Sequence, residues 1–201
     1  MAVCQDLSHP PHPGDGRGFA FCTHFLERVN SLKGRNQQSS FDTRRLTFGA
    51  VFGALIMLAT MYLRIPGATG YYHLGDGLIY ASAILLGPVT GGMAAAIGSS
   101  LADLLSGYAV WTLPTFIIKG LTAVVVGYIA MGSTSLIRNA CAMIAGALVT
   151  IVGYGVATYF MYGAPAVLPE TYFNLAQTGL GILIGLLLIW WNRMRPDSMP
   201  R

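Results

Sequence analysis

The chain has 201 residues, of which 54% are hydrophobic and 10% are charged, and its net charge is +4. Soluble domains carry about 25% charged residues. Between residues 46 and 191 the charged residues are Arg64, Asp76, Asp103, Lys119, Arg138 and Glu170. Six charged residues cannot cover the surface of a soluble domain of this size. The composition therefore excludes a soluble domain and predicts a polytopic membrane protein. The basic excess is then topology information and does not indicate nucleic-acid binding.

The polar first part of the chain, residues 1–45, contains Pro- and Gly-bearing stretches such as HPPHPGDGRG. We expect a disordered cytoplasmic extension, because this segment lacks the apolar content to fold. Its possible metal ligands are His9, His12, Cys22 and His24. Their spacing matches no standard ligand pattern, so we predict neither a metal nor a cofactor.

Apolar segments predict an all-α integral membrane protein built as a bundle of six transmembrane helices. The expected spans are 46–63, 75–86, 91–105, 115–131, 138–161 and 171–191. The second span is the shortest of the six and falls below the roughly 20 residues that a helix needs to cross a bilayer. We expect loops over 106–113 and 163–169, and Pro114 in the first turn of the fourth span. The domain division is therefore an extension over 1–45, a membrane domain over 46–192 and a basic cytoplasmic tail over 193–201.

The distribution of Lys and Arg predicts that both termini are cytoplasmic. With that orientation, one basic residue, Arg64, lies in an outer loop. The inner side holds Lys33, Arg35, Arg44, Arg45, Arg138, Arg193, Arg195 and Arg201.

Polar residues then gather in the outer third of the bundle, while the inner two-thirds is nearly free of them. This asymmetry favours a pocket open to the exterior over a proton relay or a continuous pore, which need polar groups at every depth. Aromatic residues at the same level could stack on a planar ligand. The predicted substrate-binding residues are Arg64, Tyr72, His73, Asp76, Asp103, Tyr108, Trp111, Lys119, Asn174 and Gln177.

Structural explanations for some of these residues stay open at this point. Asp76 and Glu170 could each cap the N-terminus of a helix. Asp103 and Lys119 could form an ion pair between neighbouring helices instead of contacting ligand. Tyr108 and Trp111 could anchor a loop at the membrane interface.

The first span carries small residues at four-residue spacing. These residues, Gly49, Ala50, Gly53 and Ala54, predict one face suited to close helix contact in lipid. Either a helix of the same chain or a separate membrane subunit could use that face.

Three stretches, GYYHLGDGLIYASAILLGP, GSSLADLLSGY and PTFIIKGL, resemble the substrate-binding S components of energy-coupling factor (ECF) vitamin importers, riboflavin-type branch. The resemblance covers about 46–191. It implies a six-helix subunit that captures a vitamin at the outer face and works with a coupling transmembrane subunit and two ATPases in the cell membrane. The family's Ala-x-x-x-Ala contact pattern matches Ala50 and Ala54. The ligands it allows include pyridoxine, a hydroxymethylpyrimidine and riboflavin.

Two other functions compete with this one. An intramembrane enzyme could use Asp103 as a base, but the sequence lacks HExxH and GxSxG motifs and a second catalytic group at depth. A self-sufficient secondary transporter should show an internal repeat, and none is convincing. We therefore expect a binding subunit without catalytic activity.

Overall fold

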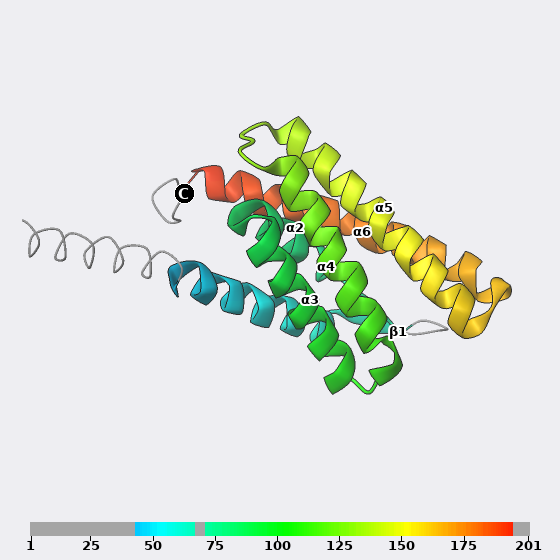
Figure 1. Cartoon of the computed structure of the whole chain (residues 1–201). Helices are drawn as coiled ribbons and strands as arrows, with labels where there is room; N and C mark the ends of the chain where they lie inside the picture. The colour runs from blue at the N-terminus through cyan, green and yellow to red at the C-terminus, as the bar shows by residue number, and fades with distance from the viewer. Residues whose placement is uncertain (1–42, 67–70, 195–201) are drawn as a thin grey trace, which may run out of the picture. The chain divides into compact units, whose positions relative to one another are not determined.

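The structure is a computed structural model that describes residues 43–66 and 71–194. The predictions for residues 1–42 and 195–201 lie outside the described residues. The described part is mostly helical (Figure 1). Its first helix spans Thr43–Tyr62 and therefore begins three residues before the expected first span over 46–63.

The remaining elements follow in short succession along the chain. A hairpin of β1 (Arg64–Pro66) and β2 (Tyr71–His73) pairs antiparallel, with Arg64 opposite His73. The helices are α2 (Asp76–Leu86), α3 (Pro88–Leu105), the 3-10 helix η1 (Ala109–Trp111), α4 (Thr112–Ala130), α5 (Leu136–Tyr162) and α6 (Ala164–Met194).

Helices occupy all six predicted segments, but four of them are long and apolar enough to cross a membrane. These are Thr43–Tyr62, Ala109–Ala130, Leu136–Tyr162 and Ala164–Asn192. Three connections differ from prediction. The expected loop over 106–113 is shorter in the structure, because η1 occupies Ala109–Trp111 and α4 begins at Thr112. The expected loop over 163–169 is wrong, because Gly163 at φ 82° ends α5 and α6 begins at the next residue. The hairpin is also absent from the all-α prediction.

The short helix α2 lies at the centre of the bundle and packs against α3, α4 and α6. It has no polar stripe, and all residues from Asp76 to Ala83 except the half-buried Leu78 are buried. A helix that is apolar on all sides is stable when neighbours surround it. The largest cluster of core residues is built around Ile79, Tyr80, Val126 and Met143.

Close contacts at glycines hold the helices around this centre. A Cβ added at Gly98 of α3 would lie 2.4 Å from the carbonyl oxygen of Gly53 in the first helix. A Cβ added at Gly181 of α6 would lie 2.7 Å from the Cβ of Asp76. Small residues therefore bring two pairs of helices together, as expected in lipid.

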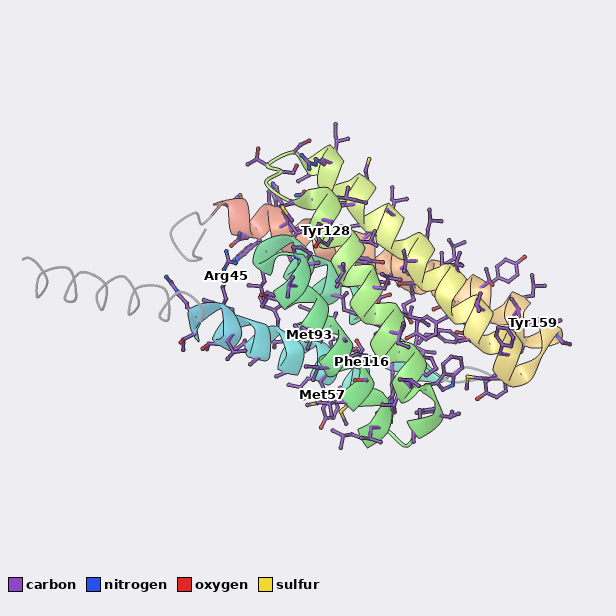
Figure 2. All side chains as sticks on the ribbon, viewed as in Figure 1. Arg45, Met57, Met93, Phe116, Tyr128 and Tyr159 are labelled. Carbon is purple, nitrogen blue, oxygen red and sulfur yellow. The ribbon has the colours of Figure 1, made fainter. Side chains whose placement is uncertain are left out.

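The outside of the bundle is apolar. Figure 2 shows Met93, Phe116, Tyr128 and Tyr159 on the outer surface, and these side chains are 40–59% exposed. Monomeric soluble proteins rarely expose such continuous apolar surface. The exposed faces and the four long apolar helices identify a multi-pass membrane protein.

The two ends of the bundle differ in charge. Arg45 lies in the first turn of the first helix. Arg138 lies in the first turn of α5, where its guanidinium donates to the carbonyl oxygens of Ile129 and Met131 at the end of α4. The opposite end carries the hairpin and the α5–α6 turn (Figure 1). The acidic residues of the described chain gather toward that second end.

Candidate functional site

The N-terminus of α2 lies deeper inside the bundle than the N-termini of α4 and α6. Asp76, its first residue, contacts Lys119, which is the eighth residue of α4, and Gln177, which is the fourteenth of α6. At a rise of about 1.5 Å per residue, these contacts lie roughly 10 Å and 20 Å from the starts of α4 and α6. Because α2 starts deeper than α4 and α6, it leaves space between these longer helices on the N-terminal side of Asp76.

A buried ion pair lies at the inner end of this space. The Lys119 Nζ lies 2.6 Å from Asp76 Oδ1, with both side chains at most 2% exposed. The Nε2 of Gln177 donates to the other carboxylate oxygen at 2.9 Å. The carboxylate is thus held by two helices other than its own, and breaking such a buried pair costs far more than an exposed one.

Gln177 also holds the hairpin against α6. Its Oε1 accepts a hydrogen bond of 3.0 Å from the backbone N–H of His73 in β2. The amide therefore connects β2 to the ion pair below it. Both polar atoms of this side chain are occupied, so Gln177 acts here mainly as a positioning residue.

Burial keeps His73 uncharged. It lowers the pKa of His73 from 6.5 to about 4, with the negative charge of Asp76 opposing this shift and the positive charge of Lys119 adding to it. The Nδ1 accepts a hydrogen bond of 3.1 Å from the backbone N–H of Gly75, so the neutral ring carries its proton on Nε2.

Glu170 and Asn174 form one side of the site. The Tyr72 hydroxyl donates to Glu170 Oε2 at 2.9 Å, and Asn174 Nδ2 donates to Glu170 Oε1 at 2.8 Å. Tyr72 is also stacked on Phe173, with ring centroids 4.5 Å apart. These contacts fix the Glu170 carboxylate and tie the hairpin to α6 a second time.

Aromatic rings form the opposite side. Trp111 from η1 lies with its ring centroid 5.8 Å from that of Tyr154 in α5. The Tyr154 hydroxyl donates to Thr115 Oγ1 at 3.0 Å, and Lys119 Nζ lies 5.2 Å from the Tyr154 ring centre. The ion pair below therefore also supports the aromatic wall.

A cavity of about 30 Å³ lies between these walls. Its lining comes from five helices and β2, which places residues more than a hundred positions apart in one site. The lining residues are His73, Asp103, Trp111, Thr115, Tyr154, Glu170, Asn174 and Gln177. A planar molecule with polar edges could contact rings on one side and carboxylate or amide oxygens on the other.

The predicted site residues separate into two groups in the structure. Those that line the cavity are His73, Asp103, Trp111, Asn174 and Gln177. Those that do not are Arg64, Tyr72, Asp76, Tyr108 and Lys119. Arg64 is exposed and Tyr108 is half-buried, whereas the other three are buried in the supporting contacts.

Three structural explanations from the sequence are wrong. Lys119 pairs with Asp76 and not with Asp103. Asp76 is not an N-cap, because Gly75 holds that position and the carboxylate faces other helices. Glu170 is not a cap either, because α6 begins six residues earlier.

The sequence analysis did not predict the lining residues Thr115 and Tyr154, and it considered Glu170 only as a possible helix cap. Thr115 lies four residues before Lys119 on one face of α4, a spacing that could have predicted it. Glu170 precedes Asn174 by four residues and Gln177 by seven, again on one face. Tyr154 had no comparable signal, since it is one of several aromatic residues in α5.

The first helix does not present a single small-residue face. Gly49 is buried and Gly53 half-buried against α3, while Ala50 and Ala54 are exposed. The turn of the helix therefore divides the four residues between two faces. One face packs inside the bundle, and the other is open to an external partner.

No group of His, Cys, Asp and Glu suited to a metal ion occurs within residues 43–66 and 71–194. The four candidate ligands of the first 45 residues lie outside the described residues.

Comparison with known proteins gives two matches. Residues 40–194 match the ECF-type riboflavin transporter S component family. The chain is also 38% identical over 132 residues to a Pyrococcus woesei protein described as an uncharacterized protein in the gap 3′ region; the match covers 65% of this chain and 88% of that protein. S components are substrate-binding subunits of vitamin transporters and not enzymes. Because the family match covers most of the sequence and all of the helices that the structure describes, the chain belongs to the ECF-type riboflavin transporter S component family.

Proposed function

We propose that the chain captures a water-soluble vitamin or vitamin precursor in the cavity at the hairpin end of the bundle, for ATP-driven uptake by an ECF importer. One observation carries the proposal. The buried acidic and basic residues of the described chain all lie at this end: His73, Asp76, Asp103, Lys119 and Glu170. Buried ionisable groups within a membrane are costly, so their collection around one cavity favours a binding function.

The other end of the core supports binding over conduction. Buried polar residues there and at mid-depth are uncharged, as in the pair of Thr122 and Thr150 with hydroxyls 2.9 Å apart, and Asn139 of α5. A proton relay would need titratable groups along the whole depth. The arrangement therefore fits a pocket closed toward one side.

The cavity lining limits the ligand to a small planar molecule with polar edges. Trp111 and Tyr154 offer ring faces, while Asp103 and Asn174 offer acceptors. Pyridoxine, a hydroxymethylpyrimidine and riboflavin all have this character. A volume of about 30 Å³ holds roughly two water molecules, whereas small-molecule pockets are typically ten times larger. Binding therefore requires the walls to move apart.

The proposed topology has six membrane crossings with both termini cytoplasmic, which puts the cavity at the outer face. Arg45 and Arg138 at the other end support this orientation through the positive-inside rule. Helix α2 alone is about 16 Å long, so the second of the six proposed crossings is the shortest.

The proposed partners are a coupling transmembrane subunit and two ATPases. Ala50 and Ala54 are exposed one helical turn apart on the first helix and offer the coupling subunit a close approach. The cavity is built from other elements. Binding of the vitamin and docking of the partner should therefore be separable.

The double substitution Ala50→Trp and Ala54→Trp tests this separation. In vesicles that contain the full complex, it should abolish ATP-dependent vitamin uptake, because bulky rings hold the partner helix away. The isolated subunit should bind its vitamin with unchanged affinity. A matched control is Val152→Trp with Val156→Trp, which are exposed at the same spacing on α5. Normal uptake by the Ala50/Ala54 variant, or equal loss in the control, would refute this assignment of the first helix.

A further inference from the structure

Thr115 places a hydroxyl on the aromatic side of the cavity. It lies in the first turn of α4, four residues after Trp111, so the two side chains share one helix face. Both residues line the cavity, and Thr115 is 3% exposed. A ring that lies against Trp111 and Tyr154 would therefore bring one of its edges to this hydroxyl.

The hydrogen bond between Thr115 and Tyr154 uses one of the two hydroxyl protons. The Tyr154 hydroxyl donates its proton to Thr115 Oγ1 at 3.0 Å. Thr115 is therefore the acceptor in this bond and keeps its own proton to donate. Among the residues that the structure describes, Thr115 makes no other hydrogen bond.

A buried threonine elsewhere in the bundle uses this proton within its own helix. Thr178, which is 1% exposed, donates from Oγ1 to the backbone oxygen of Asn174 at 2.8 Å. The corresponding acceptor for Thr115 is the backbone oxygen of Trp111, four residues earlier. These two described residues do not make that bond, so the helix leaves the Thr115 donor to the cavity.

We propose that Thr115 is a specificity-determining residue that donates a hydrogen bond to an acceptor atom in the ring plane of the ligand. The inference rests on the proposed function and specifies the chemical class of its substrate. That class is a flat heterocycle with a ring nitrogen or a ring carbonyl oxygen at the edge that meets α4. A buried donor without an acceptor is costly, so such a ligand recovers free energy that the empty site lacks.

The same physics excludes other occupants. A ring that brings a C–H or N–H group to this edge would leave the Thr115 proton buried and unpaired, and sites built to form a hydrogen bond reject such analogues strongly. Pyridoxine and a hydroxymethylpyrimidine carry ring nitrogens, and riboflavin carries ring nitrogens and carbonyl oxygens. A lipid acyl chain has no acceptor to offer.

Titration calorimetry on the full-length chain in detergent micelles tests the inference. The probes are pyridoxine, 4-amino-5-hydroxymethyl-2-methylpyrimidine and riboflavin, and the variants are measured with the probe that binds the unmodified chain most tightly. Thr115→Val keeps the shape of the side chain but removes the donor, so the dissociation constant should rise at least tenfold. Thr115→Ser retains the hydroxyl and should restore the affinity to within threefold.

Further variants separate ligand contact from support of the Tyr154 ring. Tyr154→Phe breaks the same internal hydrogen bond but leaves Thr115 its proton, so it should weaken binding at least threefold less than Thr115→Val does. The double variant Thr115→Val with Tyr154→Phe removes both hydroxyls and leaves neither one unpaired. It should therefore fold even if Thr115→Val alone does not, and should show the same tenfold loss. The control Thr178→Val removes a hydroxyl that is bonded within α6 and should leave the affinity unchanged.

The outcomes separate this inference from the proposed function. Binding within threefold of the unmodified chain by Thr115→Val, or by the double variant, would overturn the inference while leaving vitamin capture intact. Equal losses in Thr115→Val and Tyr154→Phe would also overturn it, because the pair would then only hold the Tyr154 ring in place. If none of the three probes bound to the unmodified chain, the proposed function would fail, and the inference with it.

Discussion

Replacing Lys119 with Met removes the positive charge of the buried ion pair while nearly keeping the length of the side chain. Asp76 would then be left with the Gln177 amide as its side-chain donor. Lys119 Nζ also lies 5.2 Å from the Tyr154 ring centre, so this aromatic wall would lose a neighbouring cation. The variant therefore tests whether the pair supports the site from below.

The expected cost follows from burial. Both side chains are at most 2% exposed, so water cannot replace the lost partner. Removing one member of a buried pair costs about 3–5 kcal/mol, compared with about 0–1 kcal/mol for an exposed pair. For a chain of this size that corresponds to a fall of roughly 6–20 °C in melting temperature.

The assay is thermal unfolding of purified protein in micelles for a double-mutant cycle. Lys119→Met and Asp76→Asn should each destabilise strongly, whereas the double variant should recover part of the loss, because neither charge is then left alone. We expect a coupling energy above about 1.5 kcal/mol. Additive effects, or a fall of less than about 1 kcal/mol for Lys119→Met, would refute the role of this pair.

Three further predictions concern packing, protonation and the first part of the chain. Gly98→Ala should lower the melting temperature, because its Cβ would lie 2.4 Å from the Gly53 carbonyl oxygen. The control Gly179→Ala should be neutral or stabilising, because no atom would lie within 4 Å of its Cβ. Equal effects of the two substitutions would contradict the contact between Gly98 and Gly53. Because the pKa of His73 is lowered in the folded state, the unfolded chain takes up this proton at a higher pH than the folded chain. The free energy of unfolding should therefore fall as pH drops from 6.5 toward 4, by up to about 1.4 kcal/mol per pH unit. His73→Asn should reduce this slope, and an unchanged slope would exclude His73 as its source. Deleting residues 1–40 should leave vitamin affinity unchanged, and a tenfold loss would show that this segment contributes to the site.

Much of the helical framework could be predicted from the sequence because hydrophobic segments and turn residues act locally. Gly87-Pro88 marks the α2–α3 turn, and Pro114 lies in the first turn of α4, as expected. Gly163 marks the α5–α6 turn, but the expected loop over 163–169 lies where α6 has already begun. Helix-breaking residues are weaker signals in membrane helices, where neighbours satisfy the freed backbone groups.

The level of the site could be predicted, but its internal contacts could not. Depth follows from position along a helix, which placed Asp103 and Asn174 near the same end. Partner choice depends on how the helices pack. The approach of α6 to α2 at Gly181 brings Gln177 to Asp76, and Lys119 then pairs with this carboxylate in place of Asp103.

Tyr154 shows a second limit. A tyrosine in the last third of α5 has the same sequence character whether it faces lipid or the core, since both surroundings are apolar. Tyr159, five residues later, is 55% exposed, whereas Tyr154 is 9% exposed and lines the cavity. The helix rotation that distinguishes them is set by tertiary packing.

The most direct test of the central claim is mass spectrometry of the small molecules released from the purified full-length chain. Vitamin capture predicts one water-soluble vitamin or precursor per chain, which is lost when Asn174 is replaced by Leu. The Arg138→Gln variant should retain it. Release of lipid alone, together with no shift in melting temperature on adding any of the candidate vitamins, would contradict the account.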